Sequence, residues 1–227
     1  MNNKQQYLIL KRFYKNKKIL ITGATGFKGS WLAFWLYKIG AKVFTTGNNP
    51  NKNKNLFYGL GLEKKTNLNI FDIREYDKLN KILHKIKPDV IFHLAAQPLI
   101  LKSYTNPKET YEVNSLGTLN LLESCRSIKS LKSIICVTSD KCYESNYSTK
   151  GFKEMDKLGG KDPYSGSKAS AEIIINTYNE SFFKKTKIGL ASARAGNVIG
   201  GGDWSDNRLI PDAIRSIKKN KTIYLRN

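Results

Sequence analysis

The sequence predicts an α/β fold, in which helices cover both faces of a doubly wound parallel sheet. Short apolar segments rich in β-branched residues alternate along the chain with longer segments of helical periodicity. A glycine-rich turn joins the first of these strands to the first helix. At 227 residues, the chain is long enough to bury one large core. Strand and helix in regular succession are typical of right-handed crossovers between parallel strands.

The first half of the chain contains four of the predicted strands. Residues 18–22 form an apolar strand that runs into the glycine turn, and the helix after the turn ends at Gly40. The remaining elements of this half are expected at 41–46, 66–71 and 89–95 for the strands, and at about 75–86 for a helix that Pro88 stops.

The second half continues the alternation. A long helix is expected at about 107–128, followed by a strand at 133–137. Another helix begins near Pro163, and a strand at 187–193 follows it. The last residues, 222–227, suggest a further strand that is just beginning.

Composition narrows the class of protein. The net charge is +21, but the lysines are spread over the whole chain without a basic helix, so we expect a solvated basic surface and no nucleic-acid partner. No apolar run reaches the roughly 18 residues of a membrane helix, which predicts a soluble, cytoplasmic protein without a membrane partner. The three cysteines lack metal-ligand spacing, so no metal is expected, and Cys125 and Cys136 are predicted core residues.

Three glycines, Gly23, Gly26 and Gly29, are spaced by three residues between the first strand and the first helix. Glycine permits a tight turn and a close approach of the backbone to a pyrophosphate, whose charge the helix N-terminus favours. A glycine triplet alone is weak evidence. Its position in this sheet predicts a Rossmann-type dinucleotide site rather than a structural turn.

The sequence leaves the choice of dinucleotide open. The second strand should end in an acid that binds the ribose hydroxyls of NAD, but residues 45–49 (TTGNN) contain none. Asp72, after the third strand, could reach the adenine edge or could be an ordinary helix N-cap. Neither NAD nor NADP is therefore selected at these positions.

Tyr164 and Lys168 are a candidate catalytic pair. Their spacing alone means little, because Tyr7/Lys11 and other pairs match it in this lysine-rich chain. Only the Tyr164 pair opens the helix after the strand at 133–137, where the spacing stacks both side chains on one helical face. A lysine cation, together with a positively charged nicotinamide, would lower the pKa of Tyr164 toward neutrality and create a phenolate base.

The strand at 133–137 ends in a polar cluster formed by Thr138, Ser139, Asp140 and Lys141. Ligands of open α/β sheets bind at the carboxyl ends of the strands. The cluster is therefore either a turn or a site, and its position beside the Tyr164 helix favours a site.

These residues carry a family resemblance. The glycine turn, HLAAQ at 93–97, Ser139 and the Tyr164/Lys168 pair resemble the extended short-chain dehydrogenase/reductases that act on nucleotide sugars. The longer stretches TGATGFKGSWL, VTSDKCYE, LGGKDPYSGSKA and RAGNVIGGGDWSDNRLIPD resemble the CDP-glucose 4,6-dehydratase family. The resemblance covers nearly everything from Lys17 to Asn227. One departure is Ala24, where that family often has histidine.

The resemblance implies NAD as the cofactor and a role for each matching residue. The implied cofactor-binding residues are Gly23, Thr25, Gly26, Phe27, Gly29, Asp72, Ile73, Leu94, Ala95, Ala96, Tyr164 and Lys168. The implied substrate-binding residues are Gln97, Asn197 and Arg208. The implied catalytic residues are Ser139, Asp140, Lys141, Tyr164 and Lys168.

The implied reaction is the dehydration of CDP-glucose to CDP-4-keto-6-deoxyglucose. Hydride leaves C4, the resulting ketone acidifies the hydrogen at C5, water is lost across C5 and C6, and the hydride returns to C6. Asp140 and Lys141 would serve as acid and base. The alternatives are another nucleotide-sugar 4,6-dehydratase, a 4-epimerase and a non-catalytic cofactor-binding sensor. A 4-epimerase would not need the Asp140/Lys141 pair.

The resemblance also implies the domain organisation. Residues 1–16 would be an N-terminal extension, 17–195 an NAD-binding Rossmann domain with the catalytic residues, and 196–227 the start of a smaller substrate-binding region that is largely missing from this chain. A homodimer through the two long helices is expected.

Overall fold

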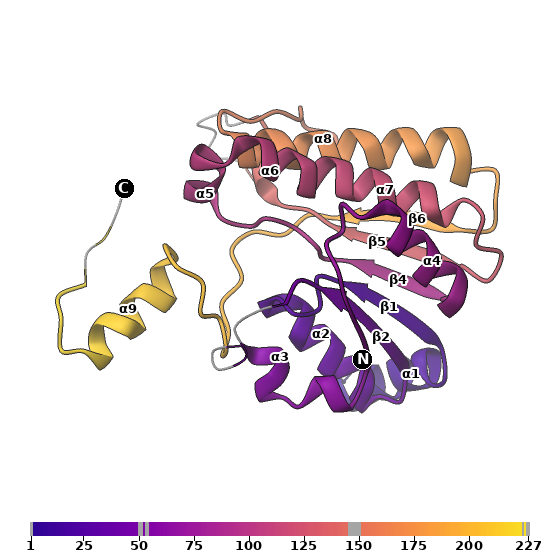
Figure 1. The fold of residues 1–227 in the computed structure, drawn as a ribbon, viewed down its shortest axis with the longest axis horizontal. Coiled ribbons are helices and arrows are strands. Elements are labelled where there is room, and N and C mark those ends of the chain that lie inside the picture. The colour runs from indigo at the N-terminus through magenta and orange to yellow at the C-terminus, as the bar shows by residue number, and fades with distance from the viewer. Residues whose placement is uncertain (1, 50–51, 53–54, 145–150, 224, 226–227) are drawn as a thin grey trace.

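The computed structural model describes residues 2–49, 52, 55–144, 151–223 and 225. Its centre is a six-stranded sheet with the order β3-β2-β1-β4-β5-β6, in which all neighbouring strands are parallel. Figure 1 shows helices on both faces of this sheet. The direction in which strands are added reverses between β1 and β4, which is the switch point where doubly wound folds bind ligands. The predicted fold class is therefore confirmed.

The strands lie close to their predicted positions. β1 (Lys18–Thr22) and β5 (Ser133–Val137) have the predicted bounds. The others are β2 (Lys42–Gly47), β3 (Asn67–Ile70), β4 (Val90–His93) and β6 (Gly189–Ala193). β4 ends at His93, two residues before the predicted end, and the residues that follow it form a loop.

The two faces of the sheet bury separate apolar clusters. Leu20 and Ile91 belong to the face covered by α4 (Tyr76–Ile86), α7 (Gly117–Cys125) and α8 (Pro163–Tyr178). Ile19 and Ile21 belong to the face covered by α2 (Phe27–Lys38) and α3 (Leu56–Gly59). Because successive side chains of a strand alternate between faces and both faces are covered, β1 is apolar along most of its length.

The long helix predicted at about 107–128 is interrupted. It consists of α6 (Pro107–Tyr111) and α7, which are joined by a π-helical turn at Glu112–Leu116. Within this turn the Asn114 side chain is buried between the Gln97 backbone and the Ser167 hydroxyl. A second π-helical turn, Asn179–Phe183, follows α8. A local insertion of this kind leaves the apolar periodicity nearly intact, so the pattern did not predict it.

Four α-helices among the described residues were not predicted, one of which is α3, introduced above. α1 (Asn3–Tyr14) occupies the N-terminal extension and begins with a capping box between Asn2 and Gln5. α5 (Ile100–Thr105) follows β4. α9 (Leu209–Lys218) lies beyond the carboxyl ends of the strands, away from the sheet (Figure 1). The strand expected at 222–227 falls partly outside the described residues, and Thr222 and Ile223 are not in a strand.

Cys125 and Cys136 are buried in the core as predicted, and Cys142 is buried too. Within the described ranges, none of the helices combines the length and the apolar character that crossing a membrane requires.

Candidate active site

A cavity of about 840 Å³ opens at the carboxyl ends of the central strands, at the switch point between β1 and β4. One wall contains the glycine turn after β1 and the residues that follow β4 and β5. The opposite wall is the segment 195–205, and Arg208 with the first turns of α9 completes it. This volume is within the range of small-molecule and cofactor sites.

The glycine turn has the geometry that its sequence predicts. Gly23 has a φ of +69°, and a Cβ atom there would lie 2.5 Å from the backbone nitrogen of Ala95. A Cβ at Gly29 would lie 2.3 Å from the carbonyl oxygen of Gly23. Gly26 is the N-cap of α2 and is exposed at the cavity. The N-terminus of α2 therefore lies at the cavity, where its amides and dipole favour an anion.

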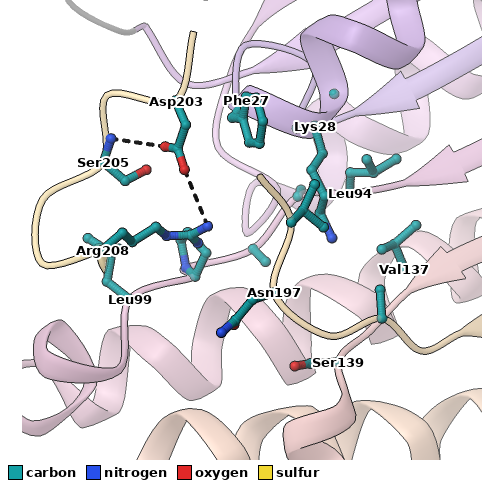
Figure 2. Close-up of a pocket in the computed structure, with 18 of the residues that line it drawn as sticks. Phe27, Lys28, Leu94, Leu99, Val137, Ser139, Asn197, Asp203, Ser205 and Arg208 are labelled. Atoms are coloured by element: carbon teal, nitrogen blue, oxygen red, sulfur yellow. Dashed lines mark hydrogen bonds and ion pairs between the residues drawn. The ribbon is translucent and has the colours of Figure 1, made fainter. Parts of the chain in front are cut away.

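Four lysine and arginine residues line the cavity: Lys28, Lys141, Lys168 and Arg208. Lys168 is fully buried, and burial, followed by the charge of Lys28, lowers its pKa to about 8. Burial, followed by the charge of Arg208, lowers the pKa of Lys28. Figure 2 shows the side chain of Lys28 reaching toward Leu94 and Val137, above Asn197. This charge suits an anionic ligand such as a diphosphate. Sequence reasoning overlooked Lys28, although its place inside the glycine turn, in the first turn of α2, was a usable signal.

Ser139 and Tyr164 meet at the cavity. Both residues are buried, and both line the cavity. In the protein alone, burial raises the pKa of Tyr164 above its ordinary value and outweighs the opposing effect of Ser139. The expected lowering by Lys168 and a nicotinamide cation together stays a prediction for the cofactor-bound protein.

Asp140 and Lys141 follow Ser139 in a short 3₁₀ turn, Asp140–Cys142. The Ser139 hydroxyl donates to Asp140 Oδ1 at 3.1 Å, and the Lys141 N–H donates to Ser139 Oγ at 3.2 Å. Lys141 lines the cavity with an exposed side chain, whereas Asp140 lies just outside the lining.

The other residues expected to bind the cofactor also lie at this cavity. They are Thr25, Phe27, Asp72, Ile73, Leu94, Ala95 and Ala96. Asp72 is not the N-cap of α4, a position that Glu75 occupies. Its carboxylate instead accepts the Arg74 backbone N–H at 2.9 Å and pairs with the Arg74 guanidinium at 2.8 Å.

The three expected substrate-binding residues divide into two groups. Asn197 and Arg208 line the cavity, and Arg208 pairs with Asp203 at 3.7 Å (Figure 2). Gln97 is buried outside the lining. Its amide donates to the Thr110 hydroxyl at 3.0 Å and to the Leu99 carbonyl at 3.1 Å, and its oxygen accepts the Leu99 N–H at 2.7 Å. In this structure the Gln97 side chain holds the loop after β4.

The strand order, the glycine turn at the switch point and the Tyr164/Lys168 pair beside β5 define a Rossmann-type protein of the short-chain dehydrogenase/reductase class. The family described as GDP-mannose 4,6 dehydratase matches residues 20–227. The chain belongs to this family.

Individual relatives agree with this membership. The CDP-glucose 4,6-dehydratase of Salmonella typhimurium is 43% identical over 225 residues, which are 97% of this chain and 63% of that protein. Among solved structures, the epimerase Mth375 of Methanothermobacter thermautotrophicus has a TM-score of 0.80 at 24% identity, covering 98% of this chain and 64% of that one. The dTDP-glucose 4,6-dehydratase of Bacillus anthracis, in complex with NAD, has a TM-score of 0.76 at 24% identity, covering 91% and 63%. The chain thus spans less than two thirds of each of these proteins.

Proposed function

We propose that the protein is an NAD-dependent 4,6-dehydratase that converts CDP-glucose to CDP-4-keto-6-deoxyglucose. The observation that carries the proposal is the convergence of Ser139, Lys141, Tyr164 and Lys168 on one cavity beside the glycine turn. The choice of CDP-glucose among nucleotide sugars is supported by the 43% identity to the Salmonella typhimurium relative.

NAD fits the residues of the cavity. Gly23, Gly26 and Gly29 would hold its pyrophosphate, because the turn brings backbone amides and the N-terminus of α2 to one place. Asp72 and Ile73 would contact the adenine, with Leu94, Ala95, Ala96, Thr25 and Phe27 around the remainder. When bound, NAD supplies a hydride acceptor for C4 of the sugar and the hydride that C6 later receives. The NAD complex of the Bacillus anthracis dehydratase, which has the same fold, supports this choice.

Side chains that line the cavity, together with the adjacent Asp140, would transfer the protons of the reaction. Tyr164 would remove the proton of the C4 hydroxyl, while Ser139 would hydrogen-bond to the C4 oxygen. Lys141 would take the C5 proton, and Asp140 would give a proton to the C6 hydroxyl, which leaves as water. When hydride then reaches C6, the proton held by Lys141 would return to C5, so that the sugar loses one water molecule overall.

The charges around the cavity support this division of roles. Because Lys168 has a pKa of about 8, most of it is protonated at neutral pH. A bound nicotinamide cation would add to that charge and oppose the effect of burial on the pKa of Tyr164. Asn197 and Arg208 would contact the substrate diphosphate on the opposite wall.

The proposal is tested by mass spectrometry over a panel of CDP-, dTDP-, UDP- and GDP-linked hexoses. The purified chain is assayed alone and as a chimera extended with the C-terminal part of the Salmonella typhimurium relative. The expected result is a product lighter by one water from CDP-glucose, and none from the Tyr164→Phe variant. An epimerised product of unchanged mass would favour a 4-epimerase instead. If neither protein converts any sugar although NAD is bound, the sensor alternative is correct.

Cofactor identity has a separate test. Denaturation of the purified protein followed by chromatography should release NAD, because a reaction that regenerates its cofactor does not require release. The Gly26→Asp variant should lose the cofactor, because a carboxylate would repel the pyrophosphate at the N-terminus of α2. NADP as the main released species, or binding unaffected by the substitution, would contradict the assignment.

We infer the same domain division as the family resemblance implies, with residues 17–195 binding the cofactor and 196–227 beginning the substrate-binding part. A cytoplasmic homodimer through the α7 and α8 region is proposed, without a nucleic-acid or membrane partner. Exposed apolar side chains there, Leu116 at 49% and Ile173 at 57%, support the dimer. Light scattering should give a dimer mass for the parent protein and a monomer mass for Ile173→Asp.

A further inference from the structure

Helix α8 carries a buried carboxylate that the proposed mechanism does not use. Glu172 lies one helical turn beyond Lys168 and two beyond Tyr164, and its side chain is 4% exposed. Its ion-pair partner is Arg194, which directly follows β6. Neither residue lines the cavity. An ion pair is costly to bury unless it is extensively hydrogen-bonded, so its contacts indicate what it holds in place.

Glu172 connects three elements of the fold. One carboxylate oxygen accepts the hydroxyl of Thr138, just after β5. The other accepts Ser192 Oγ of β6 at 2.9 Å and the Arg194 guanidinium at 2.8 Å. Burial acts to raise the pKa of Glu172, but the hydrogen bonds from Arg194, Thr138 and Ser192 together lower it below its ordinary value. The carboxylate is therefore charged at neutral pH.

Arg194 continues the connection on the other side. Its second terminal nitrogen donates to the Tyr143 hydroxyl at 2.9 Å and to the backbone carbonyl of Glu154 at 2.8 Å. The guanidinium also lies 4.8 Å from the centroid of the Tyr143 ring, which stacks on Phe152 with a centroid distance of 4.5 Å. A planar guanidinium can satisfy these contacts together, which an ammonium cannot.

The two residues thus hold both ends of one short segment, residues 138–143. Glu172 binds Thr138 at its start, and Arg194 binds Tyr143 at its end. The segment carries Ser139, and its internal hydrogen bonds, such as that from the Cys142 N–H to the Ser139 carbonyl at 3.2 Å, are short-range turn contacts. Its backbone is also tied to the chain beyond β6, because the Asp140 N–H donates to Ala195 at 3.0 Å.

We propose that the Glu172–Arg194 ion pair is a clamp that holds the 138–143 segment against α8. The clamp keeps Ser139 and Lys141 facing the same cavity as Tyr164. Glu172 and Arg194 are positioning residues, because they act through Thr138 and Tyr143 without touching the cavity. The importance of this arrangement for catalysis rests on the proposed function, but the clamp itself does not.

Two conservative variants test the clamp. Tyr143→Phe removes only the hydroxyl that Arg194 binds and keeps the stacked ring. Arg194→Lys keeps a positive charge for Glu172 but cannot reach all the partners of the guanidinium. Glu180→Gln is the matched control, because it breaks the surface pair with Lys184 beyond the end of the same helix. Glu172→Gln is informative only if the variant folds, so the test does not depend on it.

Amide hydrogen exchange of the 227-residue chain is the first measurement. Both conservative variants should accelerate exchange in the 138–143 segment by about tenfold, the effect of losing one hydrogen bond to a charged group. Exchange in β1 and β4 should not change, and the control should match the parent protein throughout. Unchanged exchange in the segment, or an equal acceleration across the sheet, would overturn the clamp.

The second measurement is the rate of nicotinamide reduction on mixing the NAD-loaded chain with CDP-glucose. Both variants should slow this step by about tenfold with NAD affinity unchanged, because the glycine turn is untouched. If the pair were purely structural, the variants would lower the melting temperature without slowing reduction selectively at unchanged NAD affinity. Parental reduction rates in both variants would overturn the positioning role. If neither the parent chain nor the chimera reduces nicotinamide with any nucleotide sugar, the proposed function fails, whereas the exchange measurement still decides whether the clamp exists.

Discussion

Acid should destabilise this protein because of one buried histidine, His93, at the end of β4. Its Nδ1 lies 2.7 Å from Thr22 Oγ1, and its Nε2 lies 3.1 Å from Thr118 Oγ1. The Thr118 hydroxyl donates its hydrogen to the Asn114 carbonyl, so Nε2 carries the ring proton and Nδ1 accepts from Thr22. The ring is neutral in this network, with one nitrogen donating and the other accepting a hydrogen bond.

The environment opposes a charged ring. Burial, followed by the charge of Lys168, lowers the pKa of His93 from 6.5 to about 3. Below pH 6.5 the unfolded chain therefore binds a proton that the folded chain does not, and the free energy of unfolding falls with falling pH. The slope is about 1.4 kcal/mol per pH unit, which gives a loss of about 2 kcal/mol between pH 6.5 and 5. That loss is a large part of a typical stability of about 5–15 kcal/mol.

The window from pH 6.5 to 5 isolates this histidine from the other shifted groups. Asp72, Glu123 and Glu172 have lowered pKa values, so their contributions are present above about pH 4 and are lost only below it. Lys168 has a pKa of about 8 in the folded protein, so its protonation differs from that of the unfolded chain only above about pH 8.

Urea denaturation at several pH values checks this prediction. The parent protein should lose about 2 kcal/mol over the window, and His93→Gln, whose amide can bond to both threonines, should lose almost none. His84→Gln replaces the second of the two histidines and should retain the parental slope. If His93→Gln keeps that slope as well, the buried histidine does not set the acid stability and the reasoning is wrong.

Substitutions at three other positions should separate packing, electrostatics and chemistry. Gly29→Ala would place Cβ 2.3 Å from a backbone oxygen, so urea denaturation should show a loss of about 2–3 kcal/mol, whereas Gly59→Ala, with no atom within 4 Å, should change little. Lys28→Met should raise the pKa of Lys168 above about 8, and an unchanged ¹³C NMR titration of the lysine Cε would refute their coupling. Lys141→Met, assayed in the family-length chimera, should still reduce nicotinamide but lose exchange of the C5 hydrogen with deuterated solvent. Near-parental product formation would show that Lys141 is not the base.

Much of the fold was predictable from local pattern. β1 and β5 were predicted with their observed bounds, because strands covered on both faces are continuous apolar runs with polar residues at their ends. The glycine turn was predictable because glycine adopts the φ of +69° at Gly23 without strain and has no Cβ to collide with the backbone close by. The capping box of α1 was also readable in the sequence at Asn2 and Gln5, although it was overlooked.

Part of the candidate site was predictable for the same reason. The helical spacing of Tyr164 and Lys168, and the place of Ser139 after a buried strand, were enough to bring them to one edge of the sheet. The hydrogen-bond and ion-pair partners of the polar side chains were not predictable. Gln97 bonds to the loop after β4 and to Thr110, and Asp72 pairs with Arg74. Which of several nearby partners a polar side chain chooses depends on distances that the sequence does not contain.

The sheet, the glycine turn and the positions from which the reactive side chains project follow from the sequence alone, because these depend on periodicity and on backbone sterics. The electrostatics depend on the packing of the chain. Packing raises the pKa of Tyr164 in the protein alone, brings the charge of Lys28 close to Lys168, and joins Glu172 to Arg194, which are 22 positions apart in the chain. Desolvation and charge coupling depend on how completely water is excluded and on which distant segments meet, and both follow from packing of the whole chain.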